Sequence, residues 1–442
     1  MANPIPNLFK VPELKEKILF TLMVLLIYRV GAHITTPGVD YRTLQLIFGQ
    51  FQNTLLGVYD MFVGGALSRA TIFALGIMPY ISASIMFQLL AAVFPTIEKM
   101  QKEGEDGRKK LTQWTRYATI VLAMLQGYGY AIFVQTLQGG AAVNNPGFFS
   151  FVLPTTLILT VGATFVMWLG EQITERGIGN GMSLLIFFSI IEGFPTAVAN
   201  TWEAFTTDVI SAFGLIVLLI VMIGVVAGVV AMTMASRKIP VQIPRKVMGR
   251  GRVREGQKSF IPLRINSAGV MPIIFAQSII IVPGTLAAFS NVTFLQGLQQ
   301  ALAPGSLWYN ILYTVLIVFF TYFYTAIIFN PVDLAENLKK QGAFVPGVKP
   351  GARTAEYIDR VLTRISFPGS LFLTAVAIVP QLVLDAVGVP FLGRLLGGTG
   401  LLIVVGVGLD TVQQMQQHLL LRHYDGFMKR GRVKFRGRQR YI

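Results

Sequence analysis

The sequence contains no cysteine among its 442 residues and only three histidines, His33, His418 and His423, which lie far apart. Disulfides, cysteine-ligated metals and a cysteine nucleophile are therefore excluded. The sequence also lacks the G-x-x-x-x-G-K-[ST] nucleotide loop, the H-E-x-x-H zinc motif and the G-x-S-x-G nucleophile motif. We therefore expect no enzyme activity, no bound metal and no cofactor.

Charge is scarce as well, because only 13% of the residues are Asp, Glu, Lys or Arg, whereas 53% are hydrophobic. This composition is typical of an all-α polytopic membrane protein. Ten apolar runs are long enough to cross a bilayer core of about 30 Å as helices. They lie at residues 18–34, 71–95, 114–137, 150–170, 182–200, 209–234, 268–289, 308–329, 365–386 and 396–417.

Basic residues are distributed unevenly over the connections between these runs. Most of the 37 Lys and Arg residues fall at the two ends of the chain and in every second connection, and the other connections carry almost none. The positive-inside rule places the basic connections in the cytoplasm. We therefore expect a multi-pass protein with both termini in the cytoplasm.

The ten spans divide into halves of five, residues 1–204 and 205–442. An odd number of spans per half reverses the orientation, so a duplication would be inverted. The second span of each half carries the same pattern, Gly-x-Met-Pro-x-Ile, at residues 76–81 and 269–274. Glycine- and proline-interrupted helices at matching positions of two halves indicate the functional axis.

A short apolar stretch at residues 55–67 precedes the second span. It carries Asp60, reaches Gly64-Gly65 and is followed by Arg69. A helix of this length is too short to cross the bilayer, so it must be buried in protein or line water. We predict a short re-entrant helix beside a cavity. The alternative is an interfacial helix followed by a proline-kinked span that packs on its neighbours.

A few polar side chains fall inside the spans. They are Ser84, Gln88, Gln126, Gln277 and Ser278. They form either ordinary interhelical hydrogen bonds or a polar seam that can part. Asp410 and Glu192 are the acids that a transporter would use, although both lie toward the ends of spans.

Two long basic connections, residues 235–266 and 330–364, stand out. Alternating residues with Pro240 and Pro244 predict an extended hairpin in the first, with a tip at residues 250–252. The charges serve either as a topology signal or as a docking surface for a polyanion or an acidic partner, and we favour docking.

Several longer segments identify a family. MFVGGALSRATIFALGIMPYISASI, GEQITERGIGNGMSLLIF, NLKKQGAFVPGVKPG, TAEYIDRVLTR and GTGLLIVVGVGLD closely resemble the SecY family of bacterial protein translocase channels. The resemblance runs from about residue 10 to residue 430. It implies ten transmembrane helices in two inverted halves around an hourglass pore, closed by a re-entrant plug helix.

The resemblance also implies functional residues. The pore ring would be formed by Ile77, Ile81, Met182, Ile186, Ile274 and Ile403. The plug, at about residues 57–69, would include Tyr59, Asp60, Met61, Phe62, Val63, Gly64, Gly65 and Arg69. The lateral gate, in spans two, three, seven and eight, would include Ser84, Gln88, Gln126, Gln277 and Ser278. The docking surface would include Arg245, Lys246, Arg250, Arg252, Lys349 and Arg353. Lys349 stands where family members typically carry Arg, and Met182 where Ile is more usual.

In function, the resemblance implies a channel of the bacterial cytoplasmic (inner) membrane. It would pass unfolded preproteins with signal peptides across the bilayer and release membrane segments laterally into it. SecE and SecG would be its small subunits, the SecA ATPase or a translating ribosome its driver, and SecDF and YidC further partners. Two other hypotheses are a secondary transporter, which shares inverted repeats, and a membrane scaffold, which does not explain a plug.

Overall fold

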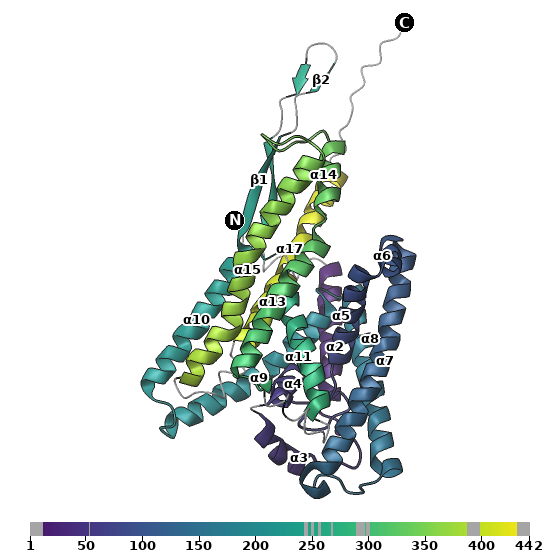
Figure 1. Ribbon diagram of the computed structural model, residues 1–442, viewed down its shortest axis with the longest axis vertical. Coiled ribbons are helices and arrows are strands. Elements are labelled where there is room, and N and C mark those ends of the chain that lie inside the picture. Colours follow the sequence, from purple (N-terminus) through teal and green to yellow (C-terminus); the bar gives the residue numbers. More distant parts are fainter. Residues whose placement is uncertain are drawn as a thin grey trace.

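The computed structural model describes residues 12–52, 54–242, 246–248, 252–254, 258–266, 268–288, 297, 301–386 and 398–430. One long helix occupies each of the ten predicted spans (Figure 1). These helices are α2 (Pro12–Gly31), α5 (Met78–Val93), α7 (Glu105–Thr136), α8 (Leu153–Arg176), α9 (Gly181–Thr206), α10 (Ala212–Met234), α11 (Met271–Ala288), α13 (Leu307–Ile328), α15 (Ala352–Ala386) and α17 (Gly398–Arg430).

Shorter elements connect the long helices. They are α3 (Tyr41–Phe48), η1 (Gly49–Phe51), α4 (Leu55–Phe62), α6 (Pro95–Lys102), η2 (Leu137–Gly140), η3 (Phe148–Val152) and α14 (Pro331–Lys340). Asp40 caps α3 by accepting hydrogen bonds from the Thr43 hydroxyl and the Arg42 backbone N–H. Those two bonds lower the pKa of the Asp40 carboxyl, because they stabilise its charged form.

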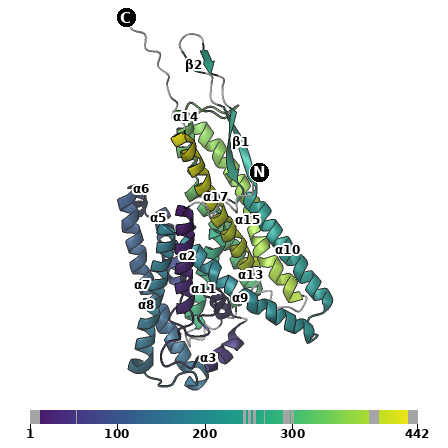
Figure 2. The same ribbon diagram turned by 180° about the vertical axis from the view of Figure 1, so that it is seen from behind.

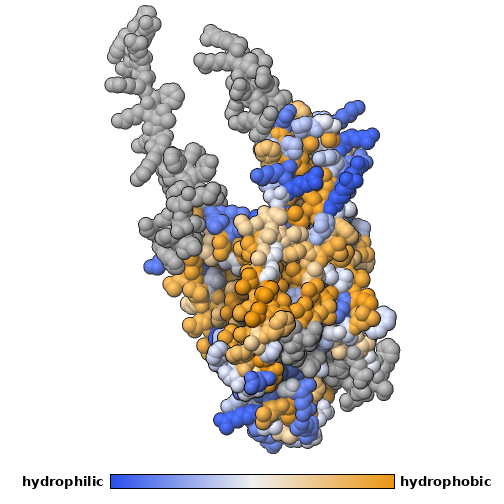
Figure 3. Space-filling model, turned by 90° about the vertical axis from the view of Figure 1, so that its left-hand side faces the viewer, coloured by the Kyte–Doolittle hydropathy of each residue, from blue (hydrophilic) through white to orange (hydrophobic). Residues whose placement is uncertain are grey.

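By length and apolar composition, six helices within the described ranges could each cross a membrane. The number is up to seven if α5 and α6, which are bent by 110° at their junction, count as one span. The apolar part of α11, Met271–Thr285, is shorter. The side of the molecule in Figure 3 is covered by hydrophobic side chains, and hydrophilic ones gather toward its two ends. This distribution fits a protein surrounded by lipid.

The long helices form two groups (Figures 1 and 2). One group contains α2, α5, α7 and α8, and the other contains α10, α13, α15 and α17. Helix α11 contacts α4, α5 and α7, and α9 contacts α17. The two groups therefore meet along α11 on one side and along α9 on the other, with the short helix α4 between them.

Four strands project from the end of the second group. Strand β1 (Ser236–Gln242) pairs antiparallel with β4 (Lys258–Arg264), and β2 (Lys246–Met248) pairs with β3 (Arg252–Arg254). The extended hairpin predicted from the sequence is therefore confirmed, but its predicted tip at residues 250–252 is wrong at one end, because Arg252 lies on β3 opposite Met248. Figure 1 shows β1, β2 and α14 at the upper end of the second group and α6 at the upper end of the first group, so three of the basic connections lie at the same ends of the two groups.

The prediction of one continuous helix over residues 71–95 is wrong at its beginning, because residues 71–77 form turns and α5 begins at Met78. Gly76 has a φ of +53° and Pro79 lies in the first turn of α5. Proline is well tolerated there because the first N–H groups of a helix lack partners within the helix. The proline therefore starts the helix rather than kinking it.

Candidate functional site

The Gly-x-Met-Pro-x-Ile pattern starts a helix in both halves. Gly269 has a φ of +61°, and α11 begins at Met271, so Pro272 is its second residue. Glycine adopts such positive φ values without the steric cost that a Cβ would add. Ile81 and Ile274 are consequently the fourth residues of their helices. The repeat therefore gives two apolar side chains equivalent positions in the two halves.

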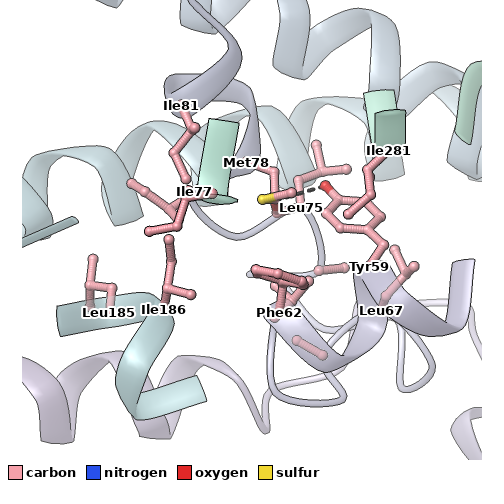
Figure 4. Close-up of a cluster of buried hydrophobic side chains, with 14 of the residues drawn as sticks. Tyr59, Phe62, Leu67, Leu75, Ile77, Met78, Ile81, Leu185, Ile186 and Ile281 are labelled. Atoms are coloured by element: carbon pink, nitrogen blue, oxygen red, sulfur yellow. Dashed lines mark hydrogen bonds between the residues drawn. The ribbon is translucent and has the colours of Figure 1, made fainter. Parts of the chain in front are cut away.

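The ring residues gather in one hydrophobic cluster. Five of them are at most 5% exposed and belong to the same set of contacting buried side chains, and these are Ile77, Ile81, Ile186, Ile274 and Ile403. The sixth, Met182, is partly buried and packs against that cluster. The residues come from α5 and its N-cap, α9, α11 and α17. Figure 4 shows Ile77, Ile81 and Ile186 turned toward one another.

Below these side chains lies the short helix α4, which is shorter than the predicted stretch of residues 55–67. It ends at Phe62 because Gly64 and Gly65 follow with φ values of +68° and +75°, which break the helical path. Phe62 and Val63 are at most 3% exposed, and Figure 4 places Phe62 beside Ile186 and below Ile77 and Ile81. A short apolar helix therefore closes one side of the isoleucine cluster.

Hydrogen bonds hold α4 in this place. The Tyr59 hydroxyl donates to the Leu75 carbonyl at 2.9 Å, and the Asp60 carboxylate accepts from the Ser68 N–H at 2.9 Å. Leu55 meets α11 of the other half at Gly284, where any added Cβ would overlap it. These bonds satisfy the buried Tyr59 hydroxyl and the partly buried Asp60 carboxylate, so both polar side chains can lie beside apolar ones.

A cavity of about 350 Å³ opens beside α4. Met61, Asp60 and Arg69 line it from the plug side, and Tyr309 and Tyr313 line it from α13. The short helix thus lies next to a cavity, as the sequence predicted. Within the described ranges, no group of three or more His, Asp or Glu side chains is arranged to hold a metal ion.

The predicted seam residues make two polar pairs. Gln88 donates to Ser84 within α5 at 3.0 Å and accepts from the Tyr324 hydroxyl of α13 at 2.7 Å. Gln277 pairs with Tyr309 at 3.2 Å. The Tyr324 bond joins the two halves directly, and the sequence reasoning missed both tyrosines. Residues 88 and 324 are 236 positions apart, so no local pattern could have paired them.

Gln277 and Tyr309 both belong to the second half, and the other two seam residues do not join the halves either. Ser278 donates to the backbone carbonyl of Ile274 within α11. Gln126 is buried in α7, and its side-chain oxygen has no hydrogen-bond partner among the residues that the structure describes.

The two long basic connections pack as one body. Gln242 of β1 exchanges backbone hydrogen bonds with Phe344 of the second connection, and a shared apolar cluster includes Val241, Leu263 and Ile358. Lys349 and Arg353 are exposed. Arg245 and Arg250 lie outside the described residues, and Lys246 and Arg252 lie on strands whose side chains are not described.

Comparisons with known proteins agree with this architecture. Residues 71–412 match the SecY family model. The chain is 46% identical over 426 residues to protein translocase subunit SecY of Pseudomonas aeruginosa, which covers 96% of this chain and 95% of that one.

Two solved structures share the fold at 18% identity, each covering 98% of this chain and all of the other. One, with a TM-score of 0.65, is a SecY protein whose plug domain stabilises the closed state of the translocation channel and maintains a membrane seal. The other, with a TM-score of 0.61, is Sec61 in the canine ribosome–channel complex from the endoplasmic reticulum.

Proposed function

Because this chain belongs to the SecY family of protein translocase subunits, we infer that it is a protein-conducting membrane channel and not an enzyme. It passes unfolded polypeptides across the membrane and releases membrane-protein segments sideways into the lipid. The halves, residues 1–204 and 205–442, are proposed to part during both processes.

The observation that carries this function is the cluster of isoleucines where the halves meet. Branched apolar side chains at a constriction exclude hydrated ions because water does not wet the gap between them. They also offer no directed hydrogen bonds, so they do not discriminate among the side chains of a passing polypeptide. We propose that the six ring residues close the pore and that the plug segment, residues 57–69, seals it from the outside.

The lateral exit is proposed to lie where α5 and α7 meet α11 and α13. The hydrogen bond from Tyr324 of α13 to Gln88 of α5 supports this assignment, because it crosses between the halves and such bonds hold helices together in lipid yet can exchange partners. The pair of Tyr309 and Gln277 joins α13 to α11 on one side of the exit. A signal peptide that enters between α5 and α13 would replace the contact between Tyr324 and Gln88. Acceptance of a signal would then depend on the balance between closed and open gates.

The basic connections and the SecY family suggest the partners of the protein and its orientation in the membrane. We propose that the end carrying the two basic connections lies in the cytoplasm, together with both termini of the chain. There it would bind SecA or a translating ribosome, as the Sec61 relative is found in a complex with a ribosome. SecE and SecG are proposed as the small subunits, and SecDF and YidC as further partners in the inner membrane.

Reconstitution tests the function against the transporter hypothesis. Proteoliposomes containing this chain with SecE and SecG should protect a preprotein from added protease only when SecA and ATP are present. They should take up no labelled amino acid or sugar. Vesicles without this chain are the control. Solute uptake in the absence of a motor, or no protected preprotein with the complete set, would contradict the proposal.

A further inference from the structure

Three charged side chains, Arg29, Arg69 and Glu192, form a cluster beside the plug and line its cavity. Arg29 and Glu192 form an ion pair between α2 and α9, and an Arg69 nitrogen lies 3.8 Å from the same Glu192 oxygen. The Glu192 side chain is only 11% exposed, and those of Arg29 and Arg69 are 37% and 29% exposed. Two arginines from different segments therefore share one largely buried carboxylate.

The glycine turn of the plug lies against the same carboxylate. A Cβ added at Gly64 would lie 3.1 Å from a Glu192 oxygen and 3.2 Å from the Ser189 carbonyl. The Ser189 hydroxyl is in turn hydrogen-bonded to Tyr28 at 2.8 Å. Because α2 and α9 are in contact, they form a fixed slot that holds the turn at the end of α4.

Arg69 is held from a second side by His33. The Arg69 guanidinium lies 3.0 Å from His33 Nε2, and His33 Nδ1 lies 3.0 Å from the Arg29 carbonyl. A carbonyl oxygen only accepts hydrogen bonds, so Nδ1 donates and, in the neutral ring, Nε2 accepts from Arg69. Arg69 therefore contacts α9 through Glu192, and it is linked to α2 through His33.

We propose that Glu192 is a positioning residue that anchors the plug through Arg69 and the Gly64 turn. This proposal explains how the plug is held in place, and it rests on the proposed function of the plug as a seal. Neutralising Glu192 would leave Arg29 and Arg69 close together without the anion that separates their charges. Removing the largely buried carboxylate destabilises the arrangement, because the two arginine charges that remain side by side repel each other. Arg69 would then move away, and α4 would leave its place under the ring more often.

The absence of cysteine from the chain allows a direct measurement of plug position. A single Met61→Cys reporter lies on α4 and lines the cavity. The complete channel complex in membranes would be treated from the outside with a maleimide that does not cross the bilayer. With Glu192→Gln we expect labelling to be about tenfold faster or more, because loss of the shared, largely buried carboxylate favours the displaced plug. Glu203→Gln, an exposed change on the same helix, is the matched control and should keep the parent rate.

Substitutions at Arg29 and Arg69 distinguish anchoring of the plug from a purely structural role of the ion pair between α2 and α9. Arg69→Gln removes the plug side of the cluster and should accelerate labelling as Glu192→Gln does. Arg29→Gln leaves Glu192 free to pair with Arg69, so its effect should be smaller. Glu192→Asp should return the rate toward that of the parent. A larger effect of Arg29→Gln than of Arg69→Gln, or a parent rate in both Arg69→Gln and Glu192→Gln, would overturn the anchor.

Deletion of residues 58–66 shows whether the proposal about the anchor or the proposal about the seal is wrong. If that deletion makes resting channels leak while Glu192→Gln leaves labelling unchanged, the plug seals the pore and the anchor is wrong. If the deletion does not leak but Glu192→Gln still accelerates labelling, the anchor stands and the sealing role of the plug fails.

Discussion

Channels in which Ile81 and Ile274 are both replaced by glycine are expected to conduct ions at rest, without any substrate. Each change removes a buried side chain whose burial contributes roughly 1.5–3 kcal/mol, and together they widen the constriction from both halves. Water can then fill the gap, and hydrated ions follow it. Single-channel current in planar bilayers is the measurement. The matched control is glycine at Ile220 and Ile223, which are exposed on the outer face of α10.

Deleting residues 58–66 from the plug should give a smaller and intermittent leak, because the isoleucine cluster remains. Two seals in series explain why neither needs to be strong: a translocating peptide must displace both. The expected order of resting current is the double glycine variant, then the deletion, then the parent together with the control. If the double glycine variant and the deletion both stay as silent as the parent, the assignment of ring and plug is wrong.

Reversing the basic charges of the two long connections should weaken ribosome binding by at least about 100-fold at low salt. Each exposed ion pair contributes up to about 1 kcal/mol, and reversal adds repulsion once that attraction is removed. The variant carries Glu at the six predicted docking residues Arg245, Lys246, Arg250, Arg252, Lys349 and Arg353. The dependence of affinity on salt should also flatten, by roughly 0.7–0.9 in the logarithmic slope for each phosphate that the surface no longer neutralises.

Binding of purified ribosomes to the reconstituted complex, measured between low and physiological salt, tests this surface. Glu at Lys109 and Lys110 is the control, because these exposed lysines lie near the start of α7 in the other half. That variant should keep most of the affinity and the parent slope. An unchanged affinity in the sixfold variant, or an equal decrease in the control, would contradict docking on these connections.

The spans and the hairpin were predictable because their signals are local. A long apolar run specifies a membrane helix by composition alone, and alternating residues with proline specify an exposed ribbon. The repeated Gly-x-Met-Pro-x-Ile pattern was also visible, but its local meaning was not. Proline kinks a helix interior yet favours a first turn. Only the backbone at Gly76 and Gly269 shows that both copies start helices.

The polar contacts were not predictable, because they join residues far apart in the sequence. Glu192 was considered as a transporter acid, whereas in the fold it pairs with Arg29 and lies close to Arg69. Tyr324 belongs to a run of aromatic residues of the kind found in many membrane spans, so the sequence does not single it out. Its partner Gln88 lies in the other half. The positions of such groups are fixed by tertiary packing, so a single sequence gives their identity but not their contacts.

If polypeptides pass between the halves at the isoleucine cluster, a preprotein stalled in the channel will contact the side chains of that cluster. A photoreactive amino acid would be placed at Ile81, at Ile274 or at the lipid-facing Ile220, and a preprotein would be arrested in the channel by a folded C-terminal domain. We expect crosslinks to the preprotein from Ile81 and Ile274 and none from Ile220. Crosslinks from Ile220 alone, or equal yields from all three positions, would contradict it.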